Sequence, residues 1–348
     1  MIEEKYMRRC IQLAENGLCN TAPNPMVGAV IVYNDRIIGE GYHIHCGEAH
    51  AEVNAIRSVK EPELLKHSTL YVSLEPCSHY GKTPPCADLI IEKQIPCVVI
   101  GCQDPFSEVA GRGIRKLQEA GCKVTVGVLE EECRHLIRRF ITYHILHRPY
   151  ITLKWAESAD KFIDLIRTDG RPVLLSSPHT SMLTHKRRAE HDAIMVGTHT
   201  ARLDNPQLNV RNWYGQAPTR VVLDRELSLS PSLALFDETI PTLIFTEKEA
   251  LSTPRKRFIR IDFRQAVLPQ IMEVLCQEKI QSLLVEGGSI LLQSFIDAQL
   301  WDEIFVEEAP AVLQNGIKAP RIEPGTPFTS EQHFGRHIRH YVASPTRS

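Results

Sequence analysis

The sequence predicts a mixed α/β fold made of two consecutive layered domains. Its 348 residues are enough for two domains of ordinary size. Strand-like apolar runs alternate with segments of helical period along the whole chain. The composition changes near residue 147, because nine of the ten cysteines lie at or before Cys133. Arg148-Pro149 then interrupts a helical pattern, so we expect domains at residues 1–147 and 148–348.

Strand and helix patterns alternate in the first half. Residues 3–17 place apolar side chains on one helical stripe, and residues 27–33 and 36–38 flank Asn34-Asp35 as a hairpin would. The further predicted strands are 69–74, 97–101 and 123–126, and the further predicted helices are 49–59, 87–91, 113–120 and 130–144. This order predicts a layered α/β domain.

The second half alternates in the same way. The predicted strands are 150–155, 193–196, 220–223, 242–245 and 282–285, and the predicted helices are 178–190, 265–277 and 290–298. Residues 198–211 are polar and rich in turn-forming residues, so we expect a loop directly after the strand 193–196. Loops at strand ends are where α/β folds bind ligands.

Composition excludes several classes of protein. Lys and Arg number 40 against 42 Asp and Glu, so the chain lacks the basic excess of a nucleic-acid binder. The apolar runs are strand-sized and too short to span a bilayer. The charged N-terminus lacks the apolar core of a secretion signal. We therefore expect a cytoplasmic protein with reduced thiols that acts on small molecules, with no nucleic-acid or membrane partner.

Three potential metal ligands stand at predicted helix starts in the first half. His50 opens one helix, Cys77 follows the strand 69–74, and Cys86 opens the next helix. One imidazole and two thiolates suit a Zn²⁺ ion that keeps its fourth position for water, as catalytic zinc does. Glu52 lies two residues beyond His50, close enough to move protons to a leaving group. Hydroxide attack with a proton shuttle is the chemistry of hydrolytic deamination.

The pattern H-x-E with P-C-x-x-C is the signature of zinc deaminases. Here eight residues separate Cys77 from Cys86, where the short form of the signature has two. The extra loop could lengthen one wall of the pocket. The alternative is that both cysteines are buried thiols and that His50 only begins a helix.

The clearest feature of the second half is a glycine turn between a strand and a helix. Glu286-Gly287-Gly288-Ser289 follows the strand 282–285 and precedes the helical run 290–298. Free backbone N–H groups and the helix dipole make such a turn suitable for phosphate. The segment lacks the dinucleotide fingerprint G-x-G-x-x-G, so an ordinary turn is the alternative.

Four motifs of the first half resemble one known family. These are Thr21-x-Pro23-Asn24-Pro25-x-Val27-Gly28, Gly39-x-Gly41-x-His43, His50-Ala51-Glu52, and the segment from Pro76-Cys77 to Cys86. Together they resemble the RibD family of bifunctional riboflavin biosynthesis proteins. In the second half the segment beginning Leu153-Lys154-Trp155-Ala156, the polar stretch 198–211 and Glu286-Gly287-Gly288 resemble the reductase half of that family. The resemblance covers nearly the whole chain.

For the first half, the resemblance implies a cytidine-deaminase-like three-layer fold. It implies a zinc-dependent deaminase acting on a diaminopyrimidinone phosphate, with His50, Cys77 and Cys86 on zinc and Glu52 as the catalytic acid and base. Asn24 and His43 would line the base pocket, because an amide and an imidazole can satisfy the polar edge of the ring. A capping Asn and a partly exposed His are the alternative roles of these two residues.

For the second half, the resemblance implies a dihydrofolate-reductase-like α/β fold that uses NADPH. The implied NADPH contacts are Ala156, Leu174, Thr200, Asp204, Gly288, Ser289, Ile290, Leu291, Leu292, Gln293 and Ser294. The implied contacts of the phosphorylated substrate are Arg188, Leu208, Arg211 and Glu286, and Lys154 would assist ring opening or hold the phosphate. Taken alone, Leu174 and Leu208 would be assigned to the core, and Arg188 to a solvated helix face.

Two departures from the family pattern and two rival functions remain. The segment 162–171 aligns poorly with the family and carries a short insertion. Lys161 stands where the family has a glycine, so we expect an altered turn there. The rival functions are a nucleotide or tRNA-base deaminase fused to an unrelated domain, and a zinc scaffold without catalysis. We expect a homo-oligomer, with a dimer favoured.

Overall fold

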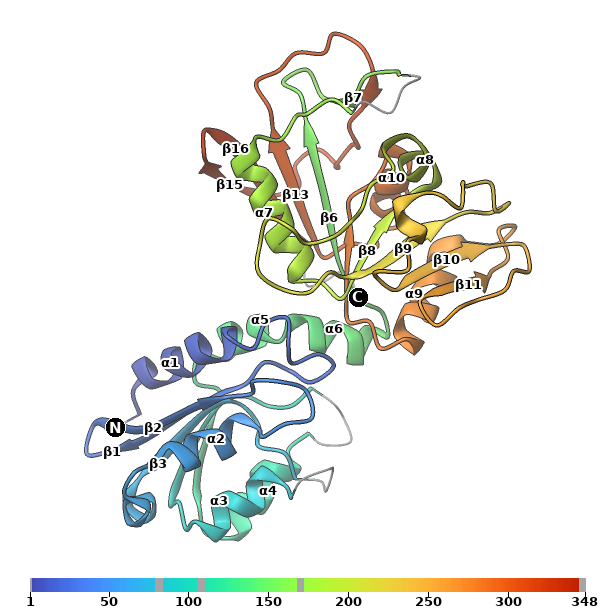
Figure 1. Ribbon diagram of the computed structural model, residues 1–348. Helices are drawn as coiled ribbons and strands as arrows, with labels where there is room; N and C mark the ends of the chain where they lie inside the picture. The colour runs from blue at the N-terminus through green and yellow to red at the C-terminus, as the bar shows by residue number, and fades with distance from the viewer. Residues whose placement is uncertain (1, 79–83, 106–109, 168–171, 344–348) are drawn as a thin grey trace. The chain divides into compact units, whose positions relative to one another are not determined.

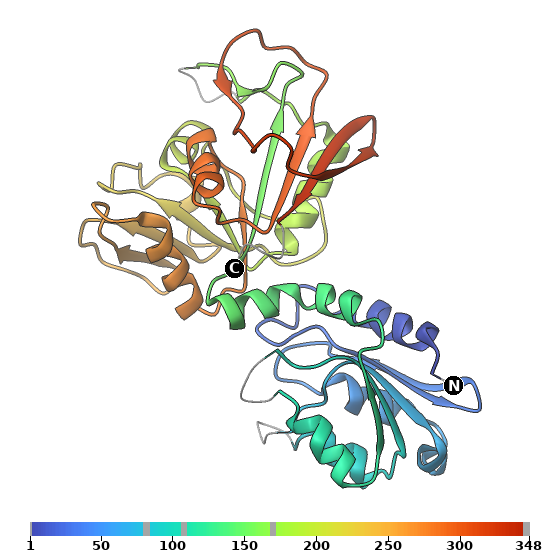
Figure 2. The ribbon, with the colours of Figure 1, turned by 180° about the vertical axis from the view of Figure 1, so that it is seen from behind.

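The computed structural model describes residues 2–78, 84–105, 110–167 and 172–343. The chain divides into two compact units, Met1–His147 and Arg148–Ser348 (Figures 1 and 2). In the part that the structure describes, no helix has both the length and the apolar character needed to cross a bilayer. The expected loop between Cys77 and Cys86 lies partly outside the described residues, which omit 79–83.

The first unit is built on a five-stranded sheet in the order β2-β1-β3-β4-β5. Its strands are β1 (Gly28–Tyr33), β2 (Arg36–Tyr42), β3 (Thr69–Leu74), β4 (Cys97–Cys102) and β5 (Lys123–Val126). Strand β1 is antiparallel to β2 and β3, whereas β3, β4 and β5 are parallel. The helices are α1 (Glu4–Glu15), α2 (Ala51–Ser58), α3 (Cys86–Glu92), α4 (Arg112–Glu119), α5 (Glu130–Leu136) and α6 (Arg138–Leu146), with a 3₁₀ turn η1 at Pro62–His67.

Helices cover both faces of this sheet, which makes three layers (Figure 1). Side chains alternate between faces along a strand, so Ala29 and Ile31 of β1 pack with α2, α3 and α4. Val30 and Val32 point the other way and pack against α1 and α5. The expected layered α/β fold is confirmed for this half.

Helix α2 lies unusually close to strand β2. A Cβ atom at Gly41 would stand 2.3 Å from the backbone nitrogen of Ala55, and one at Gly39 would stand 2.6 Å from its carbonyl oxygen. Only glycine permits this approach. The contact fixes the start of α2, where His50 and Glu52 lie.

The second unit contains a nine-stranded sheet in the order β11-β10-β9-β8-β12-β6-β13-β16-β15. Its strands are β6 (Tyr150–Glu157), β8 (Ala193–Val196), β9 (Thr219–Leu223), β10 (Thr242–Thr246), β11 (Lys256–Arg260), β12 (Ser282–Val285), β13 (Glu303–Glu308), β15 (Phe328–His333) and β16 (Arg336–Val342). Strands β15 and β16 form an antiparallel hairpin (Figure 2), β16 is also antiparallel to β13, and the remaining neighbours in this sheet are parallel. Two short strands, β7 (Phe162–Asp164) and β14 (Ile317–Lys318), pair separately.

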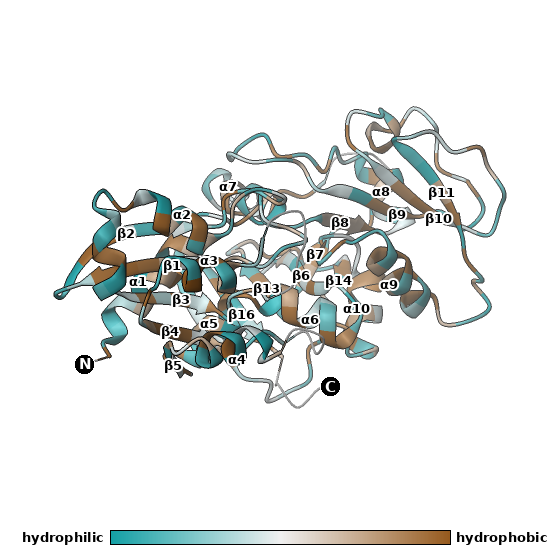
Figure 3. Ribbon diagram, turned by 90° about the horizontal axis from the view of Figure 1, so that it is seen from below, coloured by the Kyte–Doolittle hydropathy of each residue, from teal (hydrophilic) through white to brown (hydrophobic). Residues whose placement is uncertain are grey.

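Helices again cover both faces of the sheet. Helices α9 (Val267–Gln277) and α10 (Ser289–Asp297) pack on one face against the larger apolar core. Helix α8 (Thr198–Asp204) and the 3₁₀ turn η2 (Ala234–Phe236) pack on the other face, where α7 (Pro178–Ala189) also lies. The alternation of brown and teal along α1, α2 and α9 in Figure 3 shows their amphipathic character.

Two local predictions were wrong. Residues 198–211 were expected to form a loop, but the first seven form α8, because Ala201 is buried in a core with Val196 and Val222. The single helix expected at 130–144 is interrupted at Ile137, whose φ of −100° and ψ of 19° are not helical. Both differences come from tertiary packing, which overrides local propensity.

Candidate active sites

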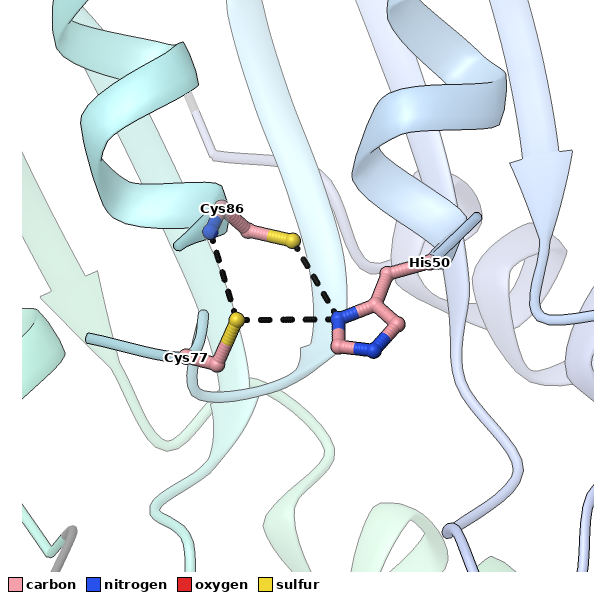
Figure 4. Close-up of side chains that lie close together, drawn as sticks. All are labelled: His50, Cys77 and Cys86. Atoms are coloured by element: carbon pink, nitrogen blue, oxygen red, sulfur yellow. Dashed lines mark hydrogen bonds between the residues drawn. The ribbon is translucent and has the colours of Figure 1, made fainter. Parts of the chain in front are cut away.

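Three side chains meet at one end of the first sheet. His50 caps α2, Cys86 is the first residue of α3, and Cys77 follows β3. The nitrogen and sulfur atoms of these residues all lie within 4.8 Å of one another. Figure 4 shows the Nδ1 atom of His50 facing both sulfur atoms, with the backbone N–H of Cys86 donating to the Sγ atom of Cys77. Helix starts carry partial positive charge, which favours thiolates.

The spacing of these atoms fits tetrahedral zinc. Zn–S and Zn–N bonds of about 2.3 and 2.0 Å at the tetrahedral angle separate nitrogen from sulfur by about 3.5 Å. The Nδ1 atom of His50 is 3.6 Å from the Sγ atom of Cys77 and 3.4 Å from that of Cys86. The two thiols are unequal in acidity: their mutual hydrogen bond lowers the pKa of Cys77 to about 4 and raises that of Cys86. Such a donor set holds three corners of a metal site and leaves the fourth open.

Glu52 lies beside this cluster on the first turn of α2. Its side chain is only 3% exposed. Burial, with the charge of Cys77 adding to it, raises the pKa of Glu52 to about 7. A carboxyl group that titrates near neutrality can both accept and donate a proton at physiological pH.

His43 and Asn24 form a short chain of hydrogen bonds next to the cluster. The Nδ1 atom of His43 is 3.1 Å from the carbonyl oxygen of Ala49, which can only accept, so Nδ1 carries the proton. The Nε2 atom therefore accepts from the amide nitrogen of Asn24 at 3.1 Å. Burial lowers the pKa of His43, which favours this neutral form. The Oδ1 atom is therefore the hydrogen-bond acceptor that the side-chain amide of Asn24 offers.

The second unit holds a cavity of about 970 Å³ at the carboxyl ends of three parallel strands. Strands β8, β12 and β6 are neighbours in the sheet, and the residues at or after their ends line the cavity. Gly288 has φ of 69°, which suits glycine, and it directly precedes α10. Its missing side chain leaves room beside Thr200, because a Cβ atom would lie 3.0 Å from the Oγ1 atom of that residue. Backbone N–H groups at this helix start are available to phosphate.

Most of the residues predicted for the reductase line this cavity. They are Lys154, Ala156, Leu174, Thr200, Asp204, Glu286, Gly288, Ser289, Ile290, Leu291, Leu292 and Ser294. Leu174 and Ile290 are 86% and 87% exposed, so a ligand would bury apolar surface there. Leu174 is therefore not the core residue that its type alone indicates.

Four predicted residues lie outside the lining formed by the described residues. Arg188 stands directly behind it and holds both oxygens of Glu286, at 2.9 and 2.6 Å. Burial opposes ionisation of Glu286, but Arg188 outweighs it and lowers the pKa of that carboxyl group. Leu208 is buried in the core around α8, Arg211 contacts His185 and Asn209, and Gln293 contacts Asp297 and the backbone of Arg321.

The lining also contains residues that the sequence did not reveal, among them Arg167 and Ser176. Arg167 forms an ion pair with Asp164 at 2.7 Å and another with Asp204. Ser176 donates a hydrogen bond to the buried Glu307 at 2.6 Å. No sequence motif indicates either residue, because the contacts join segments more than thirty residues apart.

Lys161 keeps the turn in which the family has a glycine. It has φ of 68°, and its N–H donates to the carbonyl oxygen of Ser158 at 3.0 Å. Its ammonium group pairs with Glu157 and Glu308, both at 2.8 Å. The expected alteration is therefore in side-chain contacts, while the backbone adopts the left-handed conformation that glycine favours.

Two family models match the chain. The cytidine and deoxycytidylate deaminase zinc-binding region matches residues 1–102, and the RibD C-terminal domain matches residues 149–339. The first match contains His50, Glu52, Cys77 and Cys86. The second contains every residue that lines the cavity.

Curated relatives match almost from end to end. Riboflavin biosynthesis protein RibD of Aquifex aeolicus is 39% identical over 321 residues, which cover 91% of this chain and 89% of the relative. RibD of Bacillus amyloliquefaciens is 38% identical over 338 residues, covering 94% and 90%. RibD of Escherichia coli is 34% identical over 360 residues, covering 98% and 97%.

Solved structures agree. A diaminohydroxyphosphoribosylaminopyrimidine deaminase/5-amino-6-(5-phosphoribosylamino)uracil reductase from Thermotoga maritima has a TM-score of 0.88 at 37% identity and covers 98% of both chains. RibD from Acinetobacter baumannii has a TM-score of 0.86 at 30% identity and covers 97% of this chain and 98% of that one. The expected cytidine-deaminase-like domain followed by a reductase domain is thereby confirmed. The chain belongs to the RibD family of bifunctional riboflavin biosynthesis enzymes.

Proposed function

We propose that the chain carries out two consecutive reactions on one phosphorylated pyrimidine. The first is hydrolytic deamination of 2,5-diamino-6-ribosylamino-4(3H)-pyrimidinone 5′-phosphate. The second is NADPH-dependent reduction of the ribosyl side chain, which gives 5-amino-6-(5-phospho-D-ribitylamino)uracil. The observation that carries the proposal is the cluster of His50, Cys77 and Cys86, whose ligand atoms lie within 4.8 Å beside the buried Glu52.

In the deaminase unit, His50, Cys77 and Cys86 hold the zinc ion. Bound zinc acidifies water, so that attack on C2 of the pyrimidinone is possible at neutral pH. Glu52 takes one proton of the attacking water and passes it to the 2-amino group, which leaves as ammonia. The second water proton goes to a ring nitrogen as C2 becomes a carbonyl carbon. The Oδ1 atom of Asn24 accepts a hydrogen bond from an N–H group of the ring, and His43 holds the amide in that orientation.

In the reductase unit, the cavity at the ends of β6, β8 and β12 holds the dinucleotide and the sugar. Bound in this cavity, NADPH would supply the hydride that reduces C1′ of the sugar. Lys154 donates a proton to the ring oxygen O4′ as the C1′–O4′ bond breaks and the nitrogen lone pair forms the C1′=N bond that is reduced. Arg188 keeps Glu286 ionised, and Glu286 accepts hydrogen bonds from the sugar.

The remaining predicted residues take binding roles. Arg211 and Arg188 attract the 5′-phosphate, and Leu208 supports that wall from the core. The residues that contact NADPH are Ala156, Leu174, Thr200, Asp204, Gly288, Ser289, Ile290, Leu291, Leu292, Gln293 and Ser294. The glycine start of α10 fits a pyrophosphate, since Gly288 presents backbone with no side chain.

An assay of the purified protein tests both reactions separately. With the diaminopyrimidinone phosphate as substrate, we expect ammonia release without NADPH, and NADPH oxidation only after ammonia has been released. Cytidine, deoxycytidylate and tRNA serve as competing substrates. Faster ammonia release from any of these than from the pyrimidinone phosphate would contradict the proposal.

Assembly and location complete the proposal. We infer that the enzyme works as a homodimer in the cytoplasm. Cys10, Cys77, Cys86 and Cys102 are thiols that form no disulfide, and a reducing compartment keeps thiols in that state. Analytical ultracentrifugation of the zinc-loaded protein tests the stoichiometry, and fractionation of the cells that produce it tests the location.

A further inference from the structure

Glu307 is a buried carboxylate that none of the roles above uses. It lies on β13 opposite Ala156 of β6 and Ile338 of β16. Its side chain is 2% exposed. In the part of the chain that the structure describes, no cation forms an ion pair with it. A buried charge without a paired cation is costly unless hydrogen bonds compensate it.

Two hydroxyl groups supply that compensation. The Oε2 atom of Glu307 accepts from the Oγ atom of Ser176 at 2.6 Å, and the Oε1 atom accepts from the Oγ1 atom of Thr180 at 2.5 Å. Thr180 also belongs to the capping box of α7, in which its N–H donates to Ser177. Ser176 and Ser177 line the reductase cavity. Glu307 therefore ties one wall of the cavity and the start of α7 to the sheet.

Glu307 and Lys154 lie on the same face of two neighbouring strands, because Glu307 pairs with Ala156 and Phe305, two residues before it, pairs with Lys154. Lys154 lines the cavity from β6, and its ammonium group forms no ion pair with any described residue. The charged groups that act most strongly on it are Glu286 after β12, Glu307 on β13, and Arg187 and Arg188 on α7. Burial lowers the pKa of Lys154, the two carboxylates raise it, and the two arginines lower it.

The negative charge of Glu286 is already compensated by Arg188, which donates hydrogen bonds to both of its carboxylate oxygens. Glu307 forms no ion pair within the described part of the chain; its charge acts on Lys154 in addition to that of Glu286, and it also acts on Arg187. Hydroxyl donors satisfy the hydrogen-bonding capacity of a carboxylate without removing its charge.

We propose that Glu307 is a positioning residue of the reductase, whose negative charge faces the Lys154 ammonium group and whose two hydrogen bonds hold the cavity wall at Ser176 and α7. The inference rests on the proposed role of Lys154 as proton donor. Glu307 touches neither substrate nor cofactor, and it acts through Lys154 and Ser176.

The test compares Glu307→Gln with Glu308→Gln as matched control. The first change removes the charge at constant size. The second removes the neighbouring charge on the same strand, which pairs with Lys161 and Arg339 outside the cavity. Glu307→Asp is the conservative variant, because it keeps the charge but shortens the reach to the hydroxyl groups.

Two readouts separate positioning from a merely structural role. The first is the pH profile of NADPH oxidation, and the second is an NMR titration of ¹³C-labelled lysines, with the Lys154 signal assigned from Lys154→Arg. Loss of a nearby anion destabilises the ammonium form, so in Glu307→Gln both the alkaline limb and the Lys154 titration should move to lower pH by about one unit. We expect about a threefold rise in KM for NADPH from the loosened wall, and unchanged ammonia release.

Glu307→Asp should restore the Lys154 titration but not KM, and Glu308→Gln should change neither. A Lys154 titration in Glu307→Gln at the wild-type pH overturns the inference, and so does an equal shift in Glu308→Gln. If Glu307→Gln does not fold, the wild-type comparison with Glu307→Asp and Ser176→Ala decides it, because Ser176→Ala should raise KM without moving the titration. Failure of the wild type to oxidise NADPH would instead refute the proposed function, and the lysine titration would still test Glu307.

Discussion

The two candidate active sites are built in opposite ways. The deaminase cluster uses four residues within 37 positions of sequence, three of them at helix starts or strand ends around one point. The reductase cavity draws on residues from Lys154 to Ile317, and its walls come from both faces of a large sheet. A reaction that depends on one activated water needs few groups at short distances. A hydride transfer depends on the alignment of two large molecules, so many contacts each contribute a part of the positioning.

The largest effect is expected at the deaminase cluster, whose few residues lie close together. Glu52→Gln removes the proposed proton shuttle and leaves the proposed metal ligands His50, Cys77 and Cys86 in place. Ammonia release should fall about a thousandfold. Zinc content, measured by atomic absorption, and reduction of the deaminated intermediate should both stay at wild-type levels. Retained ammonia release would show that proton transfer does not pass through Glu52.

Removal of zinc should expose the unequal acidity of the two thiols. In the metal-free protein the pKa of Cys77 is lowered to about 4, so this sulfur is a thiolate at pH 6. Thiolates react with iodoacetamide and thiols do not. Chelation should speed modification of Cys77 about thirtyfold, as read by peptide mass spectrometry, while the fully buried Cys10 stays unmodified. Equal modification of Cys77 with and without chelator would argue against it as a ligand.

A smaller effect is expected at the reductase cavity, where many residues share the binding of the ligands. Gly288→Ala puts a side chain at a φ of 69° and 3.0 Å from Thr200, where the dinucleotide should approach. The KM for NADPH should rise about tenfold, since one contact among many is lost. Gly335→Ala is the matched control, because Gly335 has φ of 75° in the β15–β16 turn with nothing near its Cβ position. A similar rise in both variants would assign the effect to backbone strain.

The smallest effect is expected at Lys161. Lys161→Gly relieves a left-handed conformation that costs about 1 kcal/mol in a non-glycine residue, and it removes the pairs with Glu157 and Glu308. Glu157 still forms an ion pair with Arg339 at 2.6 Å, so its charge remains paired after Lys161 is removed. The two terms nearly cancel, and the melting temperature of the reductase transition should change by less than about 3 °C. A larger drop would mean that the ion pairs matter more than the turn.

The sequence located regular elements well where apolar side chains follow one period. Strands 69–74, 123–126, 193–196 and 282–285 have the predicted bounds. It failed at β11, β13, β15 and β16, whose residues include many charged and polar types. Each of these strands is held by hydrogen bonds to a neighbouring strand of the sheet. That neighbouring strand is either distant in the sequence or joined to it only through a turn, so the local pattern of side chains does not reveal it.

The sequence by itself determined the chemistry of this protein, because ligand type, spacing and helix starts are local properties. His50, Glu52, Cys77 and Cys86 could be selected before any fold was known. Tertiary structure alone decided which groups share an electrostatic environment: Arg188 on Glu286, Arg167 on Asp204, and Glu307 beside Lys154. Charges act through space, and only the folded sheet brings together segments that lie 37 to 153 residues apart in the sequence.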